Sequence, residues 1–358
     1  SLANTSGLRI LEENRHPVTG KMNSIVLRLK RKQYAEFRQA YLDLSPFDRL
    51  PEQPVFSLSP AIEVQVYFPG RTFLSGDFNG DGRSDMLCWH TRGRYAGRVY
   101  LSVNNENGLF SSPQPLDWPS NPGYLPAGST FLAADINGDQ YDDILLIGTK
   151  SHGKITAWSW LNDQTKGFHE EKEIKLDSAL NSPLGGNYLV GDVSGNGHPD
   201  ICLLYREGSL RGSWLIVEGK EGSFNGRSYL ANGLFGKPEE NEKYTPLLLD
   251  FNGDGYAEPM IYWQSDEKIA RWMIAMNNGD GSFQNAFQVY FGNSLLAFMG
   301  HYSPVPGDFT GDGKCDLLVK PGSADDYTDW YLMENLGGEK FSTGREVRFG
   351  EKTDMVAW

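Results

Sequence analysis

Cysteine is scarce in this chain: there are three in 358 residues, Cys88, Cys202 and Cys315. They are odd in number, far apart and outside any CxxC pair, so neither a disulfide framework nor a zinc site is indicated, and we expect three buried thiols. No run approaches 18 consecutive apolar residues, which excludes a membrane-spanning helix. Ser1–Thr5 has no basic start or apolar core, so we expect any secretion signal to lie outside this sequence.

Positive charge is also in short supply. Lys and Arg number 33 against 46 Asp and Glu, for a formal charge of −13 and a pI near 5.0. Because binding to phosphates needs an excess of Lys and Arg, the composition argues against a nucleic-acid partner. Catalytic signatures are missing as well: HExxH, GxSxG and the P-loop do not occur. The sequence therefore favours a protein that binds rather than catalyses.

Glycine and aromatic residues are both abundant. The chain holds 41 glycines and 13% aromatics, with 39% hydrophobic and 22% charged residues overall. Hydrophobic residues at this level allow a sizeable core and exclude wholesale disorder. Glycine-rich turns joining aromatic strands are typical of an all-β protein.

A nine-residue acidic segment recurs five times. It reads DFNGDGRSD at 77–85 (loop one), DINGDQYDD at 135–143 (loop two), DVSGNGHPD at 192–200 (loop three), DFNGDGYAE at 250–258 (loop four) and DFTGDGKCD at 308–316 (loop five). The intervals between starts are 58, 57, 58 and 58 residues. Each loop is followed by a short apolar run, as in 144–147, and then by a Tyr or Trp about 14 residues later. Each unit therefore predicts about four short strands joined by tight turns.

A four-stranded unit repeated radially is the blade of a β-propeller. We predict an all-β propeller of about six four-stranded blades, with seven as the alternative, forming one domain over 1–358 with calcium loops in five blades over 73–358. The period continues weakly into 1–72, which we interpret as a degenerate first blade without a metal loop. Two further hypotheses concern the ends of the chain. The first is that Lys30–Leu44 forms a helix and does not belong to that blade. The second is that Thr353–Trp358 closes the ring.

The loops follow the pattern D-x-[N/S/T]-G-[D/N]-x-x-x-[D/E]. Side-chain oxygens at positions 1, 3, 5 and 9 and the carbonyl at position 7 suit Ca²⁺, which takes six to eight oxygen ligands. The absence of His or Cys side chains from the ligand positions argues against zinc and copper. The predicted ligands are Asp77, Asn79, Asp81, Arg83, Asp85; Asp135, Asn137, Asp139, Tyr141, Asp143; Asp192, Ser194, Asn196, His198, Asp200; Asp250, Asn252, Asp254, Tyr256, Glu258; and Asp308, Thr310, Asp312, Lys314, Asp316.

Two other interpretations of the loops are weaker. Asp, Asn and Gly form good turns without any metal, but five loops that each keep an acid at positions 1 and 9 favour calcium. An EF-hand needs Glu at position 12, where these loops have Cys, Leu, Leu, Ile and Val. Charge agrees with a cation, because five Ca²⁺ ions would bring the formal charge from −13 to about −3.

With their spacing and strand context, these loops resemble the FG-GAP/VCBS repeats of integrin α-subunit propellers and their bacterial and fungal relatives. The resemblance covers 73–358 strongly and 1–72 weakly. It implies calcium loops with a structural role in the blades. An integrin propeller has seven blades, so a chain with room for about six departs from that pattern, and an integrin-like partner surface is not implied. Similar repeats occur in mushroom lectins, secreted bacterial proteins and subunits of bacterial toxin complexes.

The sequence predicts a non-catalytic, calcium-binding propeller that binds a protein or a glycan and forms part of a larger secreted or toxin-like protein. The alternatives are a lectin in its own right and a secreted hydrolase on a propeller scaffold. Because millimolar calcium is found outside the cytosol, we expect an extracellular protein. Aromatics outside the repeat pattern are the candidate ligand-binding residues. They are Trp118, Tyr124, Tyr229, Phe235, Tyr244 and Tyr302.

Overall fold

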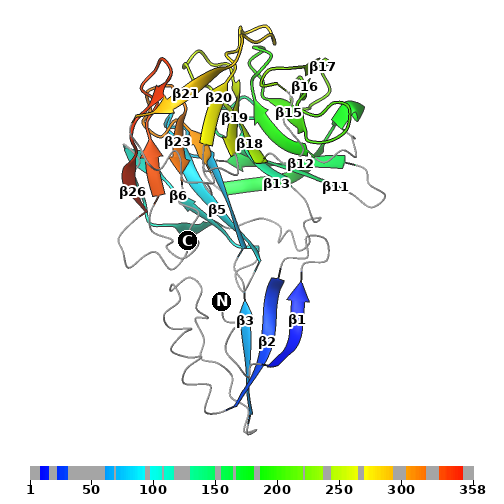
Figure 1. Cartoon of the computed structure of the whole chain (residues 1–358), viewed down its shortest axis with the longest axis vertical. Helices are drawn as coiled ribbons and strands as arrows, with labels where there is room; N and C mark the ends of the chain where they lie inside the picture. Colours follow the sequence, from blue (N-terminus) through cyan, green and yellow to red (C-terminus); the bar gives the residue numbers. More distant parts are fainter. Residues whose placement is uncertain are drawn as a thin grey trace.

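Five sheets of four antiparallel strands are arranged around a common axis in the computed structural model of the chain (Figure 1). The structure describes residues 9–15, 22–30, 61–67, 70–92, 97–106, 109–116, 130–149, 155–163, 167–180, 186–220, 222–236, 243–264, 270–292, 304–319 and 330–349. Each sheet contains one acidic loop between its first and second strands, and we number blades one to five after these loops. The prediction of four-stranded blades is thereby confirmed.

The strands of the blades are as follows. Blade one consists of β4 (Gly70–Gly76), β5 (Asp85–Arg92), β6 (Val99–Ser102) and β9 (Gln114–Leu116), and blade two of β10 (Thr130–Ala134), β11 (Asp143–Thr149), β12 (Ile155–Asp163) and β13 (Gly167–Ile174). Blade three consists of β14 (Gly186–Gly191), β15 (Asp200–Tyr205), β16 (Trp214–Val217) and β17 (Ser228–Ala231). Blade four consists of β18 (Lys243–Leu249), β19 (Glu258–Gln264), β20 (Ala270–Ile274) and β21 (Phe287–Phe291), and blade five of β22 (Val305–Gly307), β23 (Asp316–Val319), β24 (Trp330–Met333) and β26 (Arg345–Phe349).

The ring closes with these five blades. The first strands neighbour one another in the order β4, β10, β14, β18, β22, and β22 lies next to β4 again. On the outside, β26 of blade five pairs in parallel with β8 (Leu109–Phe110), which forms a hairpin with β7 (Asn104–Glu106) between β6 and β9 of blade one. At the junction of blades four and five, β21 pairs in the same way with β25 (Lys340–Phe341).

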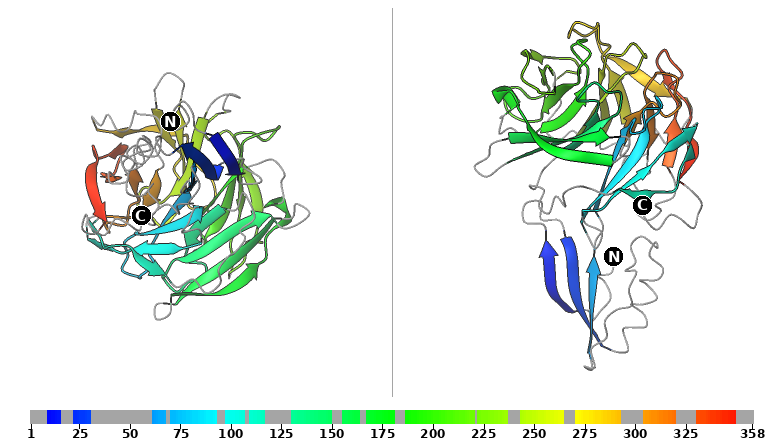
Figure 2. Two further views of the ribbon diagram at one scale, coloured as in Figure 1. Left: turned by 90° about the horizontal axis from the view of Figure 1, so that it is seen from below. Right: turned by 180° about the vertical axis from the view of Figure 1, so that it is seen from behind.

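The prediction of six or seven blades is therefore wrong. Strands β1 (Arg9–Arg15), β2 (Met22–Lys30) and β3 (Ala61–Tyr67) pair only with one another, in a three-stranded sheet that Figure 2 shows below the ring. The near-repeat spacing in this region misled the sequence interpretation, because spacing alone does not reveal which strands pair. Both the expected helix at 30–44 and the expected closing segment at 353–358 lie outside the described residues.

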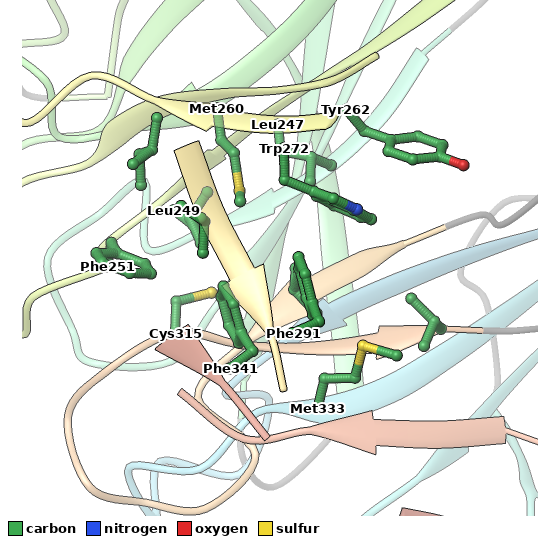
Figure 3. Close-up of a cluster of buried hydrophobic side chains, with 14 residues drawn as sticks. Leu247, Leu249, Phe251, Met260, Tyr262, Trp272, Phe291, Cys315, Met333 and Phe341 are labelled. Atoms are coloured by element: carbon green, nitrogen blue, oxygen red, sulfur yellow. The ribbon is translucent and has the colours of Figure 1, made fainter. Parts of the chain in front are cut away.

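Hydrophobic side chains fill the five seams between neighbouring blades, one buried cluster to each seam. Figure 3 shows the cluster of seam 4/5, where Phe291 and Phe341 stack with their ring centroids 4.9 Å apart. Of the periodic tryptophans, Trp214, Trp272 and Trp330 are buried, as expected for blade core, whereas Trp158 is only partly buried and packs against the cluster of seam 1/2. Burial of each large apolar side chain contributes about 1.5–3 kcal/mol, so the seams supply most of the driving force for closing the ring.

Polar bonds connect the loops across four of the five seams. The residue at position 28 of the repeat, counted from the first Asp of the loop, is a buried asparagine in blades one, two, four and five: Asn104, Asn162, Asn277 and Asn335. The side chain of Asn277, for example, donates to the carbonyl of Ala257 in its own blade (3.1 Å) and to that of Val193 in blade three (2.8 Å). Asn104 bonds to Phe309 (2.9 Å) in the same way, which joins blade one to blade five.

A second bond runs beside each asparagine. The amide at position 8 of a loop donates to the carbonyl at position 1 of the preceding loop, as from Ser84 to Asp308 (2.7 Å) and from Ala257 to Asp192 (2.7 Å). We call this pair of bonds the latch. Because a buried carbonyl without a partner is costly, the latch sets the register of neighbouring blades.

Seam 2/3 lacks both latch bonds. Position 8 of loop three is Pro199, which has no N–H to donate, and position 28 is Gly219, which has no side chain. The proline and the glycine are structurally linked, because a β-carbon at residue 219 would lie 2.0 Å from the carbonyl oxygen of Pro199. Outside the loops, seam 2/3 keeps its apolar cluster and a parallel bridge between Leu176 and Phe224. Two backbone bonds beside this bridge, from Asp177 to Phe224 (2.7 Å) and from Phe224 to Lys175 (3.0 Å), join the blades in place of the latch.

The described part of the chain holds very little helix. The single 3-10 turn Ser178–Leu180 lies at seam 2/3, and no helix among the described residues has the length and apolar character needed to cross a membrane.

The latch yields a stability prediction. Asn277→Ala leaves the buried carbonyls of Val193 and Ala257 without partners, so we expect the free energy of unfolding to fall by about 1–3 kcal/mol. The matched control is Asn278→Ala, because that neighbouring side chain is exposed and bonds only to exposed groups; its cost should stay within about 0.5 kcal/mol. Denaturant unfolding in calcium measures both, and equal costs would contradict the latch.

Candidate metal centres

The five loops are built on the same backbone arrangement. In loop one, the carboxylate of Asp77 accepts the amides of Gly80 (2.7 Å), Asp81 (3.1 Å) and Gly82 (2.7 Å), and the first aspartate of every other loop accepts the three corresponding amides. Gly80 and Gly82 have φ of 72° and 82°, which glycine adopts readily. In loop two, Gln140 occupies the second of these positions with φ 73°. The acid at position 1 thus shapes the loop.

Positions 3 and 5 continue the same turn. Asn79 Oδ1 accepts the amide of Asp81 (2.9 Å), and Asp81 Oδ1 accepts the amide of Arg83 (2.9 Å). Loops two and four repeat both bonds through Asn137, Asp139, Asn252 and Asp254. The structure therefore brings the side chains predicted at positions 1, 3 and 5 together in a tight exposed loop.

The acid at position 9 is buried beneath the loop and makes backbone hydrogen bonds. Asp85 is fully buried, and its two oxygens accept the amides of Phe78 (3.2 Å) and Asn104 (2.8 Å). The same two amides, at positions 2 and 28, bond to the position-9 acid in every loop; these acids are Asp143, Asp200, Glu258 and Asp316. The sequence analysis assigned this acid only to the ligand shell and missed its bond to the residue nineteen positions later.

Burial raises the pKa of these acids. Desolvation, together with repulsion from the nearby acids at positions 1 and 5, raises the pKa of Asp85 and of Asp143 to about 7 and that of Glu258 to about 8. In loop three, burial likewise raises the pKa of Asp200. The charged form of each acid is therefore unfavourable unless a positive charge approaches the loop.

The donor set of each loop fits a hard cation such as Ca²⁺. Carboxylates at positions 1 and 5, or one carboxylate and one amide in loop three, join an amide or hydroxyl oxygen at position 3, and all of these are oxygen donors. A carboxylate has about four acceptor sites, so the amide bonds to Asp85 leave capacity for a metal. No three His, Cys, Asp or Glu side chains in the described ranges form a cluster ready to hold a metal.

Position 7 distinguishes the loops in a way that the sequence analysis missed. Its side chain is basic in loops one and five, where Arg83 bonds to Asp81 (2.7 Å) and Lys314 to Asp312 (2.8 Å). Position 7 is Tyr141 in loop two and Tyr256 in loop four, which cannot neutralise a carboxylate. An arriving cation therefore competes with a side-chain charge in loops one and five only.

Loop three departs furthest from the others. Asn196 replaces the acid at position 5; its oxygen accepts the amide of His198 (2.7 Å) and its amide donates to Gly219 (3.0 Å). Ser194 donates its hydroxyl to Asp200 (3.2 Å). Loop three thus offers two carboxylates where the other loops offer three.

Asp142, the first acid of the Asp142–Asp143 pair, has a structural role. It occupies position 8 of loop two, where its carboxylate accepts the amide of Asp77 across seam 1/2 (2.7 Å). Burial and the neighbouring acids raise its pKa to about 7. A β-carbon at Gly76 would lie 2.6 Å from its Oδ2, so the strand before loop one has to end in glycine.

Three of the candidate ligand-binding aromatics lie together at seam 3/4. Tyr244 is buried in the cluster of that seam, and Tyr229 and Phe235 pack against it. The hydroxyl of Tyr229 faces Gly281 of blade four so closely that a β-carbon there would lie 2.2 Å away. The other three candidates, Trp118, Tyr124 and Tyr302, lie outside the described residues.

The cysteines behave as the sequence predicts. Cys88, Cys202 and Cys315 are buried and free. Burial raises the pKa of Cys202 and of Cys315 well above its usual value, which disfavours the reactive thiolate.

Comparison with known families supports the resemblance drawn from the loops. A family model described as an FG-GAP-like repeat matches residues 77–146 and 250–319. The chain therefore carries FG-GAP-like repeats, and the match includes loops one, two, four and five. Loop three, with its replaced acid and its proline, lies outside both matched regions.

Among curated proteins, the chain is similar to phosphatidylinositol-glycan-specific phospholipase D. The identity is 29% over 171 residues for the Bos taurus enzyme and 27% over 167 residues for the Homo sapiens enzyme. Each match covers 40% of this chain and 20% of the enzyme. The similarity thus spans about a fifth of these longer proteins.

The similar solved structures include the following two proteins. They are AofleA from Arthrobotrys oligospora (TM-score 0.40, 10% identity, covering 94% of this chain and 93% of that one) and the Aleuria aurantia lectin AAL in complex with Fucα1-6GlcNAc (TM-score 0.42, 11% identity, covering 79% and 80%). At these scores and identities, the similarity says nothing about what this chain binds.

The loops predict an order of calcium affinity. Affinity depends on the number of charged ligands, so loop three should lose its ion first as calcium is lowered. Asn196→Asp restores the third carboxylate and should strengthen loop three roughly tenfold. Gln114→Glu, which adds a negative charge on the exposed outer strand of blade one, should leave the affinity of loop three unchanged. A crystal grown at limiting calcium that shows loop three full and loop one or five empty would contradict the order.

The first aspartates yield a further prediction. In calcium at a hundredfold excess over Kd, Asp77→Ala or Asp308→Ala should cost about 2.7 kcal/mol of ion-derived stability, and Asp192→Ala less. All three variants lose the same three amide bonds, so their melting temperatures in EDTA should fall by similar amounts. The ranking is wrong if Asp192→Ala is the most destabilising of the three in calcium.

Proposed function

We propose that the chain is a non-catalytic ligand-binding module, a five-bladed propeller whose blades are fastened at one end by Ca²⁺. The observation that carries this proposal is the recurrence, in all five blades, of one exposed loop lined by oxygen donors above a buried acid. A metal bound in five equivalent places around a ring serves the ring as a whole, whereas catalysis needs one distinct centre.

Calcium has a specific task in this arrangement. In each loop the residues at positions 1, 3 and 5 and the carbonyl at position 7 would hold the ion, with the acid at position 9 beneath them. The bound ion supplies the positive charge that the buried acids lack. Residues of the chain hold the loop in shape. The first aspartate accepts the amides of the turn, and the acid at position 9 connects the loop to the segment after the third strand through the amides of residues such as Asn104 and Asn335.

The ligand that we propose is a protein or a glycan. A propeller presents the loops at its ends and the grooves between its blades to partners, and a rigid ring pre-organises them for binding. Because the proposed sites need calcium, we expect the protein to work outside the cytosol, where calcium is millimolar. The alternative is a lectin that acts on its own, because the ring would present its loops and grooves to a glycan in the same way as to a protein.

A module of a longer hydrolase is the second candidate function, favoured by the similarity to a part of phosphatidylinositol-glycan-specific phospholipase D. Under this proposal the chain binds or positions the substrate of the longer hydrolase and does not cleave it. The purified chain should therefore show no hydrolysis of a phosphatidylinositol-glycan, measured by release of the glycan headgroup. Turnover that survives removal of the loop metals would show instead that the chain is itself a hydrolase.

Calcium removal tests the core of the proposal. Native mass spectrometry should find close to five Ca²⁺ ions per chain, and EDTA should lower the melting temperature until calcium is restored, because the ion binds the folded loops and not the unfolded chain. Magnesium at the same concentration is the control, since it demands stricter octahedral geometry and should restore less. An unchanged melting temperature in EDTA, together with no bound metal, would remove the proposal.

The ligand class is decided by a separate measurement. We expect a glycan array and a set of extracellular proteins, each probed with calcium and with EDTA, to give binding that is lost in EDTA. Binding to glycans alone would assign the chain to the lectins. A ligand bound equally well with and without calcium would show that the loops do not support the binding surface.

A further inference from the structure

A group of hydrogen-bond donors at seam 3/4 takes no part in the loops or the latches. It lies at the end of the blades opposite loops three and four, because it is formed by the starts of β14, β16 and β18 and by the hairpin that joins β15 to β16. Bonds between Tyr205 and Ser213 (3.0 Å) and between Gly212 and Tyr205 (2.9 Å) close that hairpin. The turn between them carries two arginines, Arg206 and Arg211.

Arg206 is held rigidly at the seam. Its Nε donates to Asn187 Oδ1 (2.8 Å), its Nη2 donates to the carbonyl of Tyr244 (3.0 Å), and its guanidinium lies 4.8 Å from the centroid of the Tyr244 ring. A guanidinium has five N–H groups in a fixed fork, and these two bonds use two of them. The remaining N–H groups are positioned by neighbours that are themselves fixed in strands.

Two buried donors accompany this arginine. Tyr244 is 6% exposed, and its hydroxyl has no hydrogen-bond partner among the described groups. The indole N–H of Trp214, in the same buried cluster and 1% exposed, also has none within the described ranges. Since a buried polar group without a partner is costly, the unpartnered hydroxyl of Tyr244 beside a fixed guanidinium indicates a site that a ligand completes.

The charge of the site selects an anion. Burial raises the pKa of Tyr244, against the charges of Arg206 and Arg211, so its hydroxyl remains a donor at neutral pH. The described acid in this hairpin is Glu207, which is exposed. Among the described residues of the seam, the hydroxyl of Tyr244 and the indole N–H of Trp214 have no hydrogen-bond partner and can donate to an anion, and the cationic guanidinium of Arg206 lies beside Tyr244.

We propose that seam 3/4 binds an oxyanion, a carboxylate or a sulfate group, between the guanidinium of Arg206 and the hydroxyl of Tyr244, with Trp214 and Arg211 beside it. Planar guanidinium groups match the geometry of such anions. The site goes beyond the calcium-dependent function proposed above and does not depend on it, since none of its residues belongs to a loop.

The test uses acetate and sulfate as probes, titrated at constant ionic strength against chloride in calcium. The ¹⁵N–¹H signal of the Trp214 indole should shift and saturate with at least one probe. Tyr244→Phe removes only the hydroxyl and should weaken that probe roughly tenfold, and Arg206→Gln should weaken it further. Tighter binding of acetate identifies a carboxylate ligand, and tighter binding of sulfate identifies a sulfate ester.

Two matched controls separate a site from a general salt effect. Tyr262→Phe removes another buried hydroxyl without a partner, at seam 4/5, and Arg227→Gln removes another arginine stacked on a tyrosine, one that pairs with Glu218. Both should bind the probe as the wild type does. The proposal is overturned if the Trp214 signal does not saturate with either probe, or if Tyr244→Phe responds like Tyr262→Phe. If Arg206→Gln does not fold, the comparison of the two tyrosine variants decides alone.

Discussion

The acid at position 9 of each loop accepts amides from two places, the start of its own loop and the end of the third strand of its blade. This pair of bonds organises the ring. It fixes the position-28 residue, whose asparagine side chain then reaches the neighbouring blade in four of the five seams. A single buried carboxylate thereby ties together the loop, the blade and the adjacent blade. Its burial also creates the need for a cation, because desolvation raises the pKa of the acid.

Each loop contains favourable backbone hydrogen bonds together with unfavourable repulsion between its acids. Each first aspartate is satisfied by three amides, so the turn is stable as a backbone feature. The acids that remain, however, repel one another, and within the described loops the ion pairs to them are those of Arg83 and Lys314. A fold of this kind couples its stability to an external ion, and the local differences at positions 5 and 7 make the five sites unequal even though their backbones match.

The ring is not symmetric in its seams. Seam 2/3 loses both latch bonds through Pro199 and Gly219, and retains its apolar cluster, while seam 3/4 keeps its latch and adds a set of donors at its opposite end. Both departures involve blade three, the blade whose loop lies outside the regions matched as FG-GAP-like repeats. Blade three therefore departs from the other blades in the residues of its loop and of its latch.

The sequence by itself determined the repeat, the four-stranded blade and the residues of the five loops, because turn chemistry and strand patterning are local and recur every 57 or 58 residues. The buried asparagines Asn104, Asn162, Asn277 and Asn335 recur at the same interval, so alignment of the repeats would have revealed them as well. The number of blades was decided only by the tertiary structure. Closure depends on contacts such as that between Asn104 and Phe309, which join positions 205 residues apart, and no local pattern specifies which strands meet. The position-9 acid likewise looks like a ligand in sequence, and only burial and the amide nineteen residues later show that it also holds the blade together.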